Sequence, residues 1–272
     1  MQDIENKIPM GRDTICRMYS QSKIITTVPA LILVEEGKID LGDPVEKYLP
    51  QLSNRQVVIG GTPDQPKLEA ASHPFTVREL MTHTAGFIYG GGTDAVSELW
   101  KRANIWQAKS LNEFVDRLAP LPLAHDPGTK FEYSVSIDVF GALVEKVSGE
   151  PFEQFLRERM LCDNGTANGH RILSRKMVDL MMANNLYDLP LKYNTIRPNN
   201  HADGFGFGGE VRIEQGGDRL GSLGDFGWYG LATTFCKINR TEGVVALCLT
   251  QHLPIDWHFF RVFSNLYYQA LE

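Results

Sequence analysis

The chain has 272 residues, 43% of them hydrophobic, and a formal net charge of −6 at pH 7. This length and composition allow one large domain with a substantial buried core. The acidic balance, without any run rich in Lys or Arg, argues against nucleic acid or an anionic membrane surface as the main partner.

The first ten residues are polar, and no run approaches the roughly 20 apolar residues of a membrane-spanning helix. We therefore expect a cytoplasmic protein without a membrane span, although removal of a signal peptide would leave the same sequence. The cysteines are widely spaced and form no C-x-x-C pair. They are interpreted as reduced core residues rather than a zinc site or a disulfide framework, and they are Cys16, Cys162, Cys236 and Cys248.

Residues 23–36 are expected to form the first long helix, because apolar side chains recur on one broad face and Gly37 follows as a stop signal. Pro29 lies inside this segment. An interior proline removes one backbone hydrogen bond, so we expect a kink or a locally opened turn there.

The next segments are expected to alternate between short helices and loops. Asp43-Pro44 supplies an N-cap and a first-turn proline for a short helix that ends near Tyr48. A surface loop rich in Gly, Pro and Asn is predicted for residues 51–74, and a short helix for 77–82. Residues 84–93 contain four glycines and are expected to form a flexible connector.

In the second half of the chain, residues 136–147 show apolar residues at helical spacing, with Ser134 or Ser136 as a cap and Gly149 as the end. Strands are expected at 205–213, 228–238 and 244–250, followed by an aromatic-rich helix at 257–271. Helices gathered between an N-terminal helix and a late antiparallel hairpin predict an α+β fold, with an antiparallel sheet flanked by helices.

Several other sequence patterns lack the surrounding structure or spacing that a functional site would require. The run Gly204-Phe205-Gly206-Phe207-Gly208-Gly209 satisfies G-x-G-x-x-G, but a strand is predicted after it where a dinucleotide site needs a helix, so we expect a glycine-rich strand edge. The histidines are scattered, so neither a metal site nor a cofactor is expected. His83 is expected to make structural hydrogen bonds rather than to act in catalysis.

Ser20 and Lys23 form a Ser-x-x-Lys pair at the start of the first long helix. Residues three apart lie on the same helix face, so the hydroxyl and the amine can reach each other. A serine hydroxyl is a weak nucleophile that must lose its proton as it attacks a carbonyl, and a neighbouring amine can accept that proton. The alternative for Ser20 is a simple helix cap.

Three segments occur in a characteristic order: Ser20-x-x-Lys23, then Tyr133-Ser134-Val135, then Trp228-Tyr229-Gly230. Together with their flanks, above all the run from Pro127 to Ser134, they resemble the serine β-lactamase and penicillin-binding-protein superfamily. The similarity is to the class C-like branch that includes family VIII carboxylesterases. It implies one β-lactamase-related domain over residues 1–272, with a helical subdomain of roughly residues 40–200 inserted between the Ser20 helix and the C-terminal strands and helix.

The resemblance also implies the roles of individual residues. Ser20 is the nucleophile, and Lys23, buried and partly neutral, or Tyr133 takes its proton. Tyr133 then returns a proton to the leaving group. The backbone amides of Ser20 and Leu231 are the implied oxyanion hole. Tyr133 has a simpler alternative as a half-buried aromatic residue, as has Trp228 as a packed strand residue.

The substrate-binding positions are expected to be Trp228, Tyr229, Gly230 and Val135, and two of them depart from the β-lactamase pattern. Val135 stands where that branch has asparagine, and Trp228 where the third motif begins with lysine. Loss of these polar groups removes the contacts to a β-lactam and favours a small neutral ester or amide. The expected function is therefore a carboxylesterase without a cofactor.

The chain begins close upstream of Ser20, whereas the family places strands of its central sheet before this point, and the similarity jumps at Met160-Leu161-Cys162. A shortened sheet with an exposed edge would predict weak activity and homo-oligomers. Two further interpretations therefore stay open. One is an acyltransferase, D-amino-acid peptidase or weak β-lactamase with the same catalytic residues, and the other is an inactive scaffold or binding protein.

Overall fold

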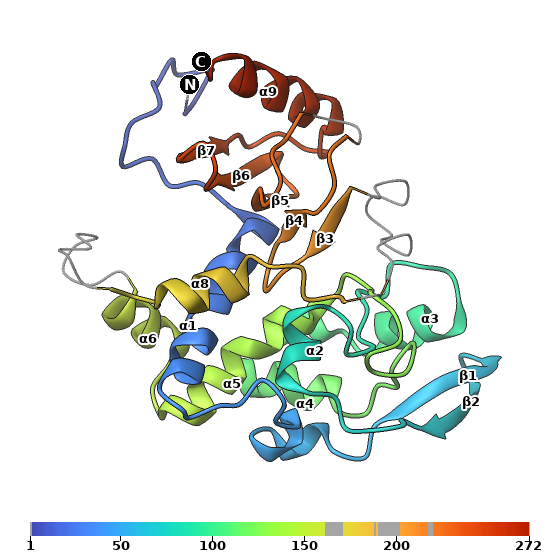
Figure 1. The fold of residues 1–272 in the computed structure, drawn as a ribbon. Coiled ribbons are helices and arrows are strands. Elements are labelled where there is room, and N and C mark those ends of the chain that lie inside the picture. Colours follow the sequence, from blue (N-terminus) through green and yellow to red (C-terminus); the bar gives the residue numbers. More distant parts are fainter. Residues whose placement is uncertain (1, 161–170, 188, 190–201, 217–219, 272) are drawn as a thin grey trace.

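The computed structural model describes residues 2–160, 171–187, 189, 202–216 and 220–271. An antiparallel sheet lies between a C-terminal helix and a larger helical part (Figure 1). The predicted α+β architecture is therefore confirmed. The strands are β1 (Gln56–Thr62), β2 (Gln65–Ala70), β3 (Asp203–Phe205), β4 (Glu210–Arg212), β5 (Phe226–Gly230), β6 (Thr234–Asn239) and β7 (Val244–Leu249).

The helices are concentrated between the N-terminal helix and β3, as expected for the helical subdomain that we propose for residues 40–200. The α-helices are α1 (Ser22–Glu35), α2 (Val77–Met81), α3 (Ala95–Arg102), α4 (Leu111–Leu118), α5 (Val139–Ser148), α6 (Phe152–Arg159), α8 (Arg175–Met181) and α9 (Trp257–Gln269). Short 3-10 helices are η1 (Tyr19–Gln21), η2 (Val45–Lys47), η3 (Pro50–Leu52), η4 (Ile105–Gln107) and η5 (Val135–Asp138). None of the helices in the described ranges is long and apolar enough to cross a membrane.

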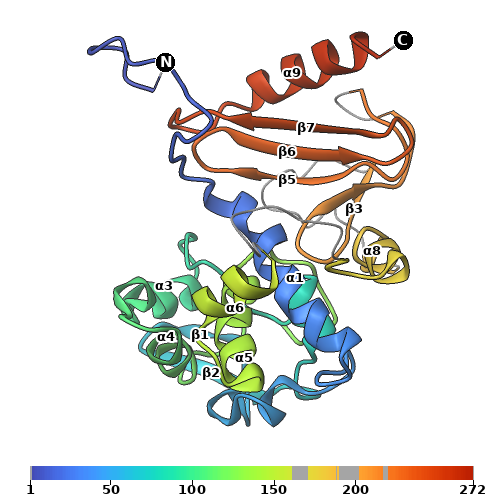
Figure 2. The ribbon, with the colours of Figure 1, turned by 90° about the vertical axis from the view of Figure 1, so that its left-hand side faces the viewer.

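The main sheet has the strand order β3-β4-β5-β6-β7, with every neighbouring pair antiparallel. Figure 2 shows α9 on one side of this sheet and α1 on the other. One buried cluster joins the sheet to α9 and includes Tyr229, Phe235 and Phe260. The larger cluster fills the helical part and reaches the sheet at Val211 and Phe226. Strands β3, β4 and β5 are thus buried on both faces, whereas β7 is partly exposed, and α1 connects the sheet to the helices.

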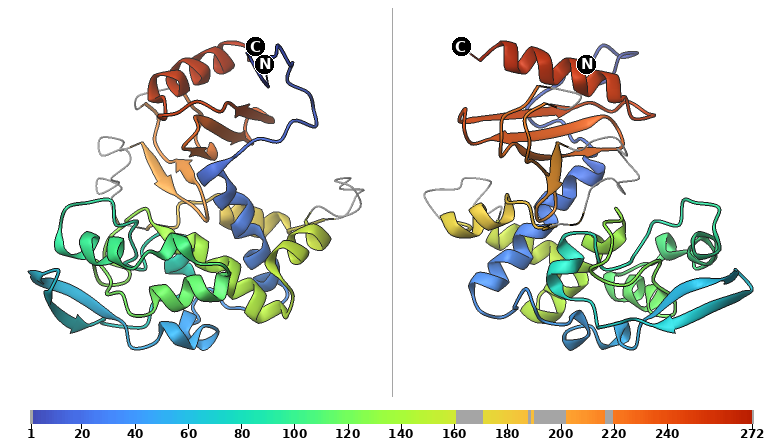
Figure 3. Two further views of the ribbon diagram at one scale, coloured as in Figure 1. Left: turned by 180° about the vertical axis from the view of Figure 1, so that it is seen from behind. Right: turned by 45° about the vertical axis from the view of Figure 1, so that its right-hand side comes forward.

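Helix α1 runs from the sheet into the helical part in both views of Figure 3. Its Ala30, Leu31 and Leu33 are fully buried, as expected for a helix that is surrounded by others. Gly37 adopts a left-handed φ of 69° just after the helix, so the predicted stop is confirmed. The helix continues through Pro29 without interruption.

Several predicted elements differ in the structure. The loop expected at 51–74 contains the hairpin of β1 and β2, because the β-branched run Val57-Val58-Ile59 outweighs the neighbouring glycines. The strand expected at 205–213 is the hairpin of β3 and β4, whose turn is closed by a bond from Gly206 N–H to the Gly209 carbonyl. The strand expected at 228–238 is likewise two strands, β5 and β6, joined by a turn at 231–233.

Residues 84–93 lack helix and strand, as expected, but their first half is not a flexible connector. Ala85 and Phe87 are fully buried. Gly86 has a φ of 90°, and a Cβ there would lie 2.4 Å from the His125 carbonyl oxygen. The glycine is therefore required by a close backbone approach. By contrast, the helices predicted at 77–82, 136–147 and 257–271 are confirmed as α2, η5 with α5, and α9.

The cysteines of the described residues are free, namely Cys16, Cys236 and Cys248. Burial raises the pKa of the Cys236 and Cys248 thiols. A raised pKa keeps a thiol protonated and unreactive, which agrees with their interpretation as reduced residues. Cys162 lies outside the described residues.

At Gly230, the last residue of β5, the strand is in close contact with the backbone that precedes Ser20. A Cβ on Gly230 would lie 2.1 Å from the Met18 carbonyl oxygen and 2.0 Å from Thr234 Oγ1. The Thr234 hydroxyl donates a 2.9 Å hydrogen bond to the same Met18 carbonyl. Only glycine permits so close an approach of two backbones. This contact attaches η1, and therefore Ser20, to the hairpin of β5 and β6.

Gly230→Ala should lower the free energy of unfolding by about 1–3 kcal/mol, the usual cost of forcing extra atoms into a packed site. Urea denaturation measures the effect. Gly91→Ala is the matched control, because a Cβ at Gly91 meets no heavy atom within 4 Å and its φ is not left-handed. Equal losses of stability in the two variants would contradict the role assigned to Gly230.

Candidate active site

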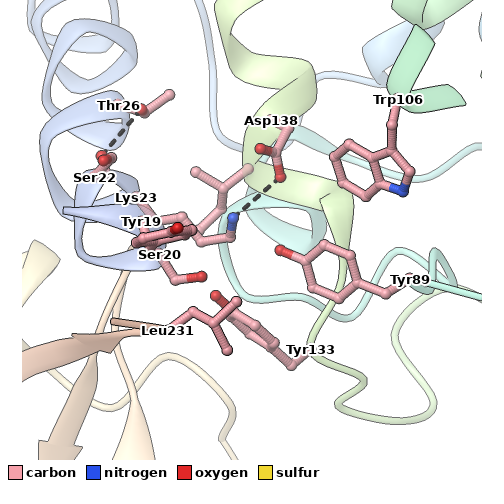
Figure 4. Close-up of a pocket in the computed structure, with 11 residues that line it drawn as sticks. Tyr19, Ser20, Ser22, Lys23, Thr26, Tyr89, Trp106, Tyr133, Asp138 and Leu231 are labelled. Atoms are coloured by element: carbon pink, nitrogen blue, oxygen red, sulfur yellow. Dashed lines mark hydrogen bonds and ion pairs between the residues drawn. The ribbon is translucent and has the colours of Figure 1, made fainter. Parts of the chain in front are cut away.

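A cavity of about 720 Å³ lies between the end of the main sheet and the helical part. Ser20, Lys23, Tyr133 and Leu231 all line it, although they come from η1, α1, the segment before η5 and the turn after β5. In Figure 4 the hydroxyls of Ser20 and Tyr133 and the amine of Lys23 point into the same space. The structure therefore brings together the predicted nucleophile, both predicted proton acceptors and both residues of the predicted oxyanion hole.

The backbone that presents Ser20 is strained. Tyr19, directly before it, has a φ of 50°, a left-handed conformation that is an outlier for a bulky residue. Such strain persists only where the surroundings impose it, and it is typical of functional turns. Here the surroundings are the contact of Met18 with Gly230 and Thr234. The first amides of a helix have no carbonyl acceptor within the helix, so the Ser20 N–H suits a developing oxyanion.

Lys23 is paired with Asp138, a residue that the sequence analysis did not single out. Its Nζ lies 3.1 Å from Asp138 Oδ2, and its side chain is only 8% exposed. Nζ also lies 5.6 Å from the ring centres of both Tyr89 and Tyr133. A carboxylate at this distance stabilises the charged ammonium. Lys23 Nζ therefore lies close to one carboxylate and to two tyrosine rings.

Tyr133 receives a hydrogen bond from Trp228, whose indole Nε1–H donates to Tyr133 Oη at 3.1 Å. Trp228 is 3% exposed and does not line this cavity. A donor at Oη and an ammonium beside the ring both stabilise negative charge on the phenol oxygen. Trp228 therefore reaches this cavity through its hydrogen bond to Tyr133, and its contact with substrate stays a prediction.

The other predicted substrate-binding residues do not reach the cavity. Val135, the first residue of η5, is fully buried. Tyr229 packs on Phe260 of α9 and lies 6.0 Å from the ring of Trp228, and its hydroxyl donates a 2.8 Å hydrogen bond to Glu210. Gly230 has its structural role against Met18. These three therefore do not line this cavity, and their contact with substrate stays a prediction.

Tyr89 and Trp106 also line the cavity and were not found from the sequence. Burial, with Tyr133 and Asp138 nearby, raises the pKa of Tyr89, so its phenol stays neutral and can donate a hydrogen bond. Its ring lies 5.4 Å from the ring of Tyr133. No motif marks Tyr89, which lies in the glycine-containing segment 84–93, and only packing of that segment against Tyr133 reveals it.

His83 packs against the ring of Tyr133. Its Nδ1 accepts a 3.2 Å hydrogen bond from the Ser134 N–H, and its ring lies 4.7 Å from that of Tyr133. Burial, with the charge of Lys23, holds the pKa of His83 well below its usual value, so the imidazole is neutral. The geometry agrees with the structural role expected for this residue. Within the described residues no group of three or more His, Cys, Asp or Glu side chains could hold a metal ion.

Comparison with known proteins identifies similar sequences. A family model described as Beta-lactamase matches residues 1–167. The chain is 26% identical to an uncharacterized protein of Mycobacterium tuberculosis, over 93% of this chain and 81% of that protein. It is 35% identical to the acyltransferase mokF of Monascus pilosus and 32% identical to the esterase EstB of Burkholderia gladioli. Each of these two alignments covers 56% of this chain but only 37% of the relative.

Solved structures share the fold. Simvastatin synthase (LovD) from Aspergillus terreus superimposes with a TM-score of 0.82 at 22% identity, covering 99% of this chain and 88% of the other. EstCE1, a hydrolase with promiscuous acyltransferase activity, gives a TM-score of 0.80 at 21% identity, covering 98% and 88%. At these identities the similarity establishes the architecture, which is that of β-lactamase-like proteins.

Trp228→Phe keeps a large ring but removes the N–H that reaches Tyr133. The turnover number kcat for a chromogenic ester should fall up to about tenfold, because one hydrogen bond contributes ~0.5–1.5 kcal/mol. Trp100→Phe is the matched control, since the Trp100 indole donates to the Pro122 carbonyl and does not line the cavity. It should lower stability without lowering kcat. An unchanged kcat in Trp228→Phe would contradict the role of its N–H.

Proposed function

The chain belongs to the beta-lactamase family, and we propose that it is a carboxylesterase that forms an acyl-enzyme on Ser20. The observation that carries this proposal is the convergence of Ser20, Lys23 and Tyr133 on one cavity. The proposal is further supported by the esterases among the similar proteins. A nucleophile, a proton acceptor and a cation in one partly closed space are the parts that acyl transfer requires.

The proposed reaction starts with attack of Ser20 Oγ on the ester carbonyl carbon, while Tyr133 Oη takes the hydroxyl proton. Tyr133 enters this step as a phenolate, which the Lys23 ammonium and the Trp228 N–H stabilise, and it becomes a neutral phenol when it takes the proton. The tetrahedral oxyanion is bound by the amides of Ser20 and Leu231. The bond to the alcohol oxygen then breaks, and Tyr133 gives its proton to that oxygen. Water attacks the acyl-enzyme by the same steps and releases the acid.

The charges around the cavity favour a neutral substrate. Among the described residues that line it, Lys23 is the single cation, and Asp138 already pairs with it. No further ammonium is available there to bind the carboxylate of a β-lactam, and Trp228 occupies the position of the family's lysine. A polar group that loses its partner on binding costs affinity, so charged substrates are disfavoured.

Acyl transfer to an alcohol is the second candidate, because a similar sequence is named as an acyltransferase and one structure as a hydrolase with acyltransferase activity. Both reactions share the acyl-enzyme and differ only in the acceptor. Adding an alcohol during ester turnover separates them. A transferase forms the new ester in preference to the free acid, whereas an esterase releases mainly the acid.

Intact-mass spectrometry after incubation with a fluorophosphonate tests the nucleophile. The wild type should gain one adduct, and peptide mapping should locate it on Ser20. Ser20→Ala should lose both the adduct and turnover of a short aryl ester. Ser22→Ala is the matched control, because Ser22 lines the same cavity and the adduct should persist.

Lys23→Ala and Tyr133→Phe should each lower kcat by about 10²-fold or more, the scale of proton-transfer catalysis.

Steady-state turnover by the wild type compares the two substrate classes. The value of kcat/KM for short acyl esters should greatly exceed that for cephalosporins. Full turnover in Ser20→Ala would overturn the proposed mechanism. Equal efficiency with the two substrate classes would overturn only the preference for neutral esters. A folded wild type that takes up no fluorophosphonate would support the inactive scaffold instead.

We also infer that the chain forms homo-oligomers through β7. Within the described residues β7 pairs only with β6, and its Val245 and Leu247 are 64% and 53% exposed. An unpaired edge with apolar side chains favours pairing with a second copy.

Light scattering should therefore give a mass above the 30.5 kDa monomer. Leu247→Lys should shift the protein toward monomer, whereas the control Ile59→Lys, on β1, should not. A monomeric wild type would contradict this inference.

A further inference from the structure

A second cavity, of about 470 Å³, adjoins the one that contains Ser20. Thr26, Trp106 and Asp138 line both cavities and form the border between them. In Figure 4 these three lie on the side of the reaction cavity away from Leu231 and Tyr133. A substrate whose ester group reacts at Ser20 can therefore extend past this border.

The wall of the second cavity is mainly apolar. Ile105, Leu111, Phe114 and Phe152 contribute large side chains from η4, α4 and α6. Gly141 of α5 leaves room for Leu111, because a Cβ there would lie 2.9 Å from a Leu111 methyl carbon. Apolar surfaces that enclose a space of this size bind apolar groups by removing them from water.

Trp106 at the border is exposed but firmly held. Its side chain is 60% exposed, yet its ring stacks on Tyr89 at 5.9 Å with an angle of 17° between the planes, and lies 6.2 Å from Phe114. The backbone before it turns through Asn104, at a left-handed φ of 49°, and Arg117 donates a 3.0 Å bond to the Asn104 carbonyl. The indole is thus positioned before any ligand binds, which lowers the entropic cost of binding.

We propose that this second cavity binds an extended aliphatic or aromatic group of the ester substrate, with Trp106 as the surface over which that group passes. The proposal rests on the proposed function at Ser20. It assigns the substrate class as neutral esters that carry a chain several carbons longer than acetate on one side of the ester bond. That chain can belong to the acyl or to the alcohol part, since both offer the same chemistry.

Two ester series test the proposal on the full chain. One contains p-nitrophenyl esters from acetate to octanoate, and the other contains acetate esters of methanol through octanol. In one series kcat/KM should rise with chain length, by up to about fourfold per methylene, as expected from ~0.8 kcal/mol for each buried CH₂. The series that shows the rise identifies the side of the ester that enters the cavity.

Ala108 offers a way to fill the second cavity, because it lines that cavity but not the first. Ala108→Trp should abolish the dependence on chain length, and the smaller Ala108→Leu should reduce it. Gln107→Trp is the matched control: it adds the same ring to the neighbouring residue, which lines neither cavity, and should keep the dependence.

The proposal is overturned if neither series shows a rise, or if the rise survives in both Ala108 variants. Labelling of Ser20 by the fluorophosphonate is measured in every variant. A wild type that is not labelled refutes the proposed function itself. A wild type that is labelled but indifferent to chain length refutes only the second cavity as a binding site.

Discussion

The site depends on the close approach of two backbones at Gly230. Because no side chain separates β5 from the Met18 carbonyl, the turn that carries Ser20 lies directly on the hairpin that carries Leu231. The two amides proposed for the oxyanion hole are thereby held by one contact. Helix α1 then continues from this turn into the helical part, where Lys23 meets Asp138 and the two tyrosines. A small displacement of the backbone at Gly230 would therefore change the distances between the catalytic groups.

The second constraint is the scarcity of charge in the site. One ion pair, between Lys23 and Asp138, supplies the only cation among the described residues that line the cavity, and aromatic side chains form much of the remainder. In these surroundings the Trp228 N–H donates to Tyr133 Oη, and this contact supports the proposed exchange of protons between Tyr133 and Ser20. The same scarcity of charge is the basis of the proposed preference for neutral esters.

Elements and site residues that carry a local sequence signal were predicted from the sequence. Those that depend on packing between distant segments were not. Cap and stop residues identified α5 and the end of α1, and the Ser-x-x-Lys pair with the resemblance located Ser20, Lys23 and Tyr133. Asp138, Tyr89 and Trp106 carry no motif and reach the site only through packing of distant segments. The hairpin of β1 and β2 was hidden by its glycines.

The central claim is that Ser20 and Leu231 form one oxyanion site on either side of the Gly230 contact. A crystal structure of the phosphonate adduct tests it most directly, because the phosphonyl oxygen mimics the oxyanion of the tetrahedral intermediate. The account predicts that this oxygen accepts hydrogen bonds from both the Ser20 and the Leu231 amides, at about 2.7–3.1 Å. An adduct on Ser20 whose oxygen points toward solvent, or toward Lys23 alone, would contradict it.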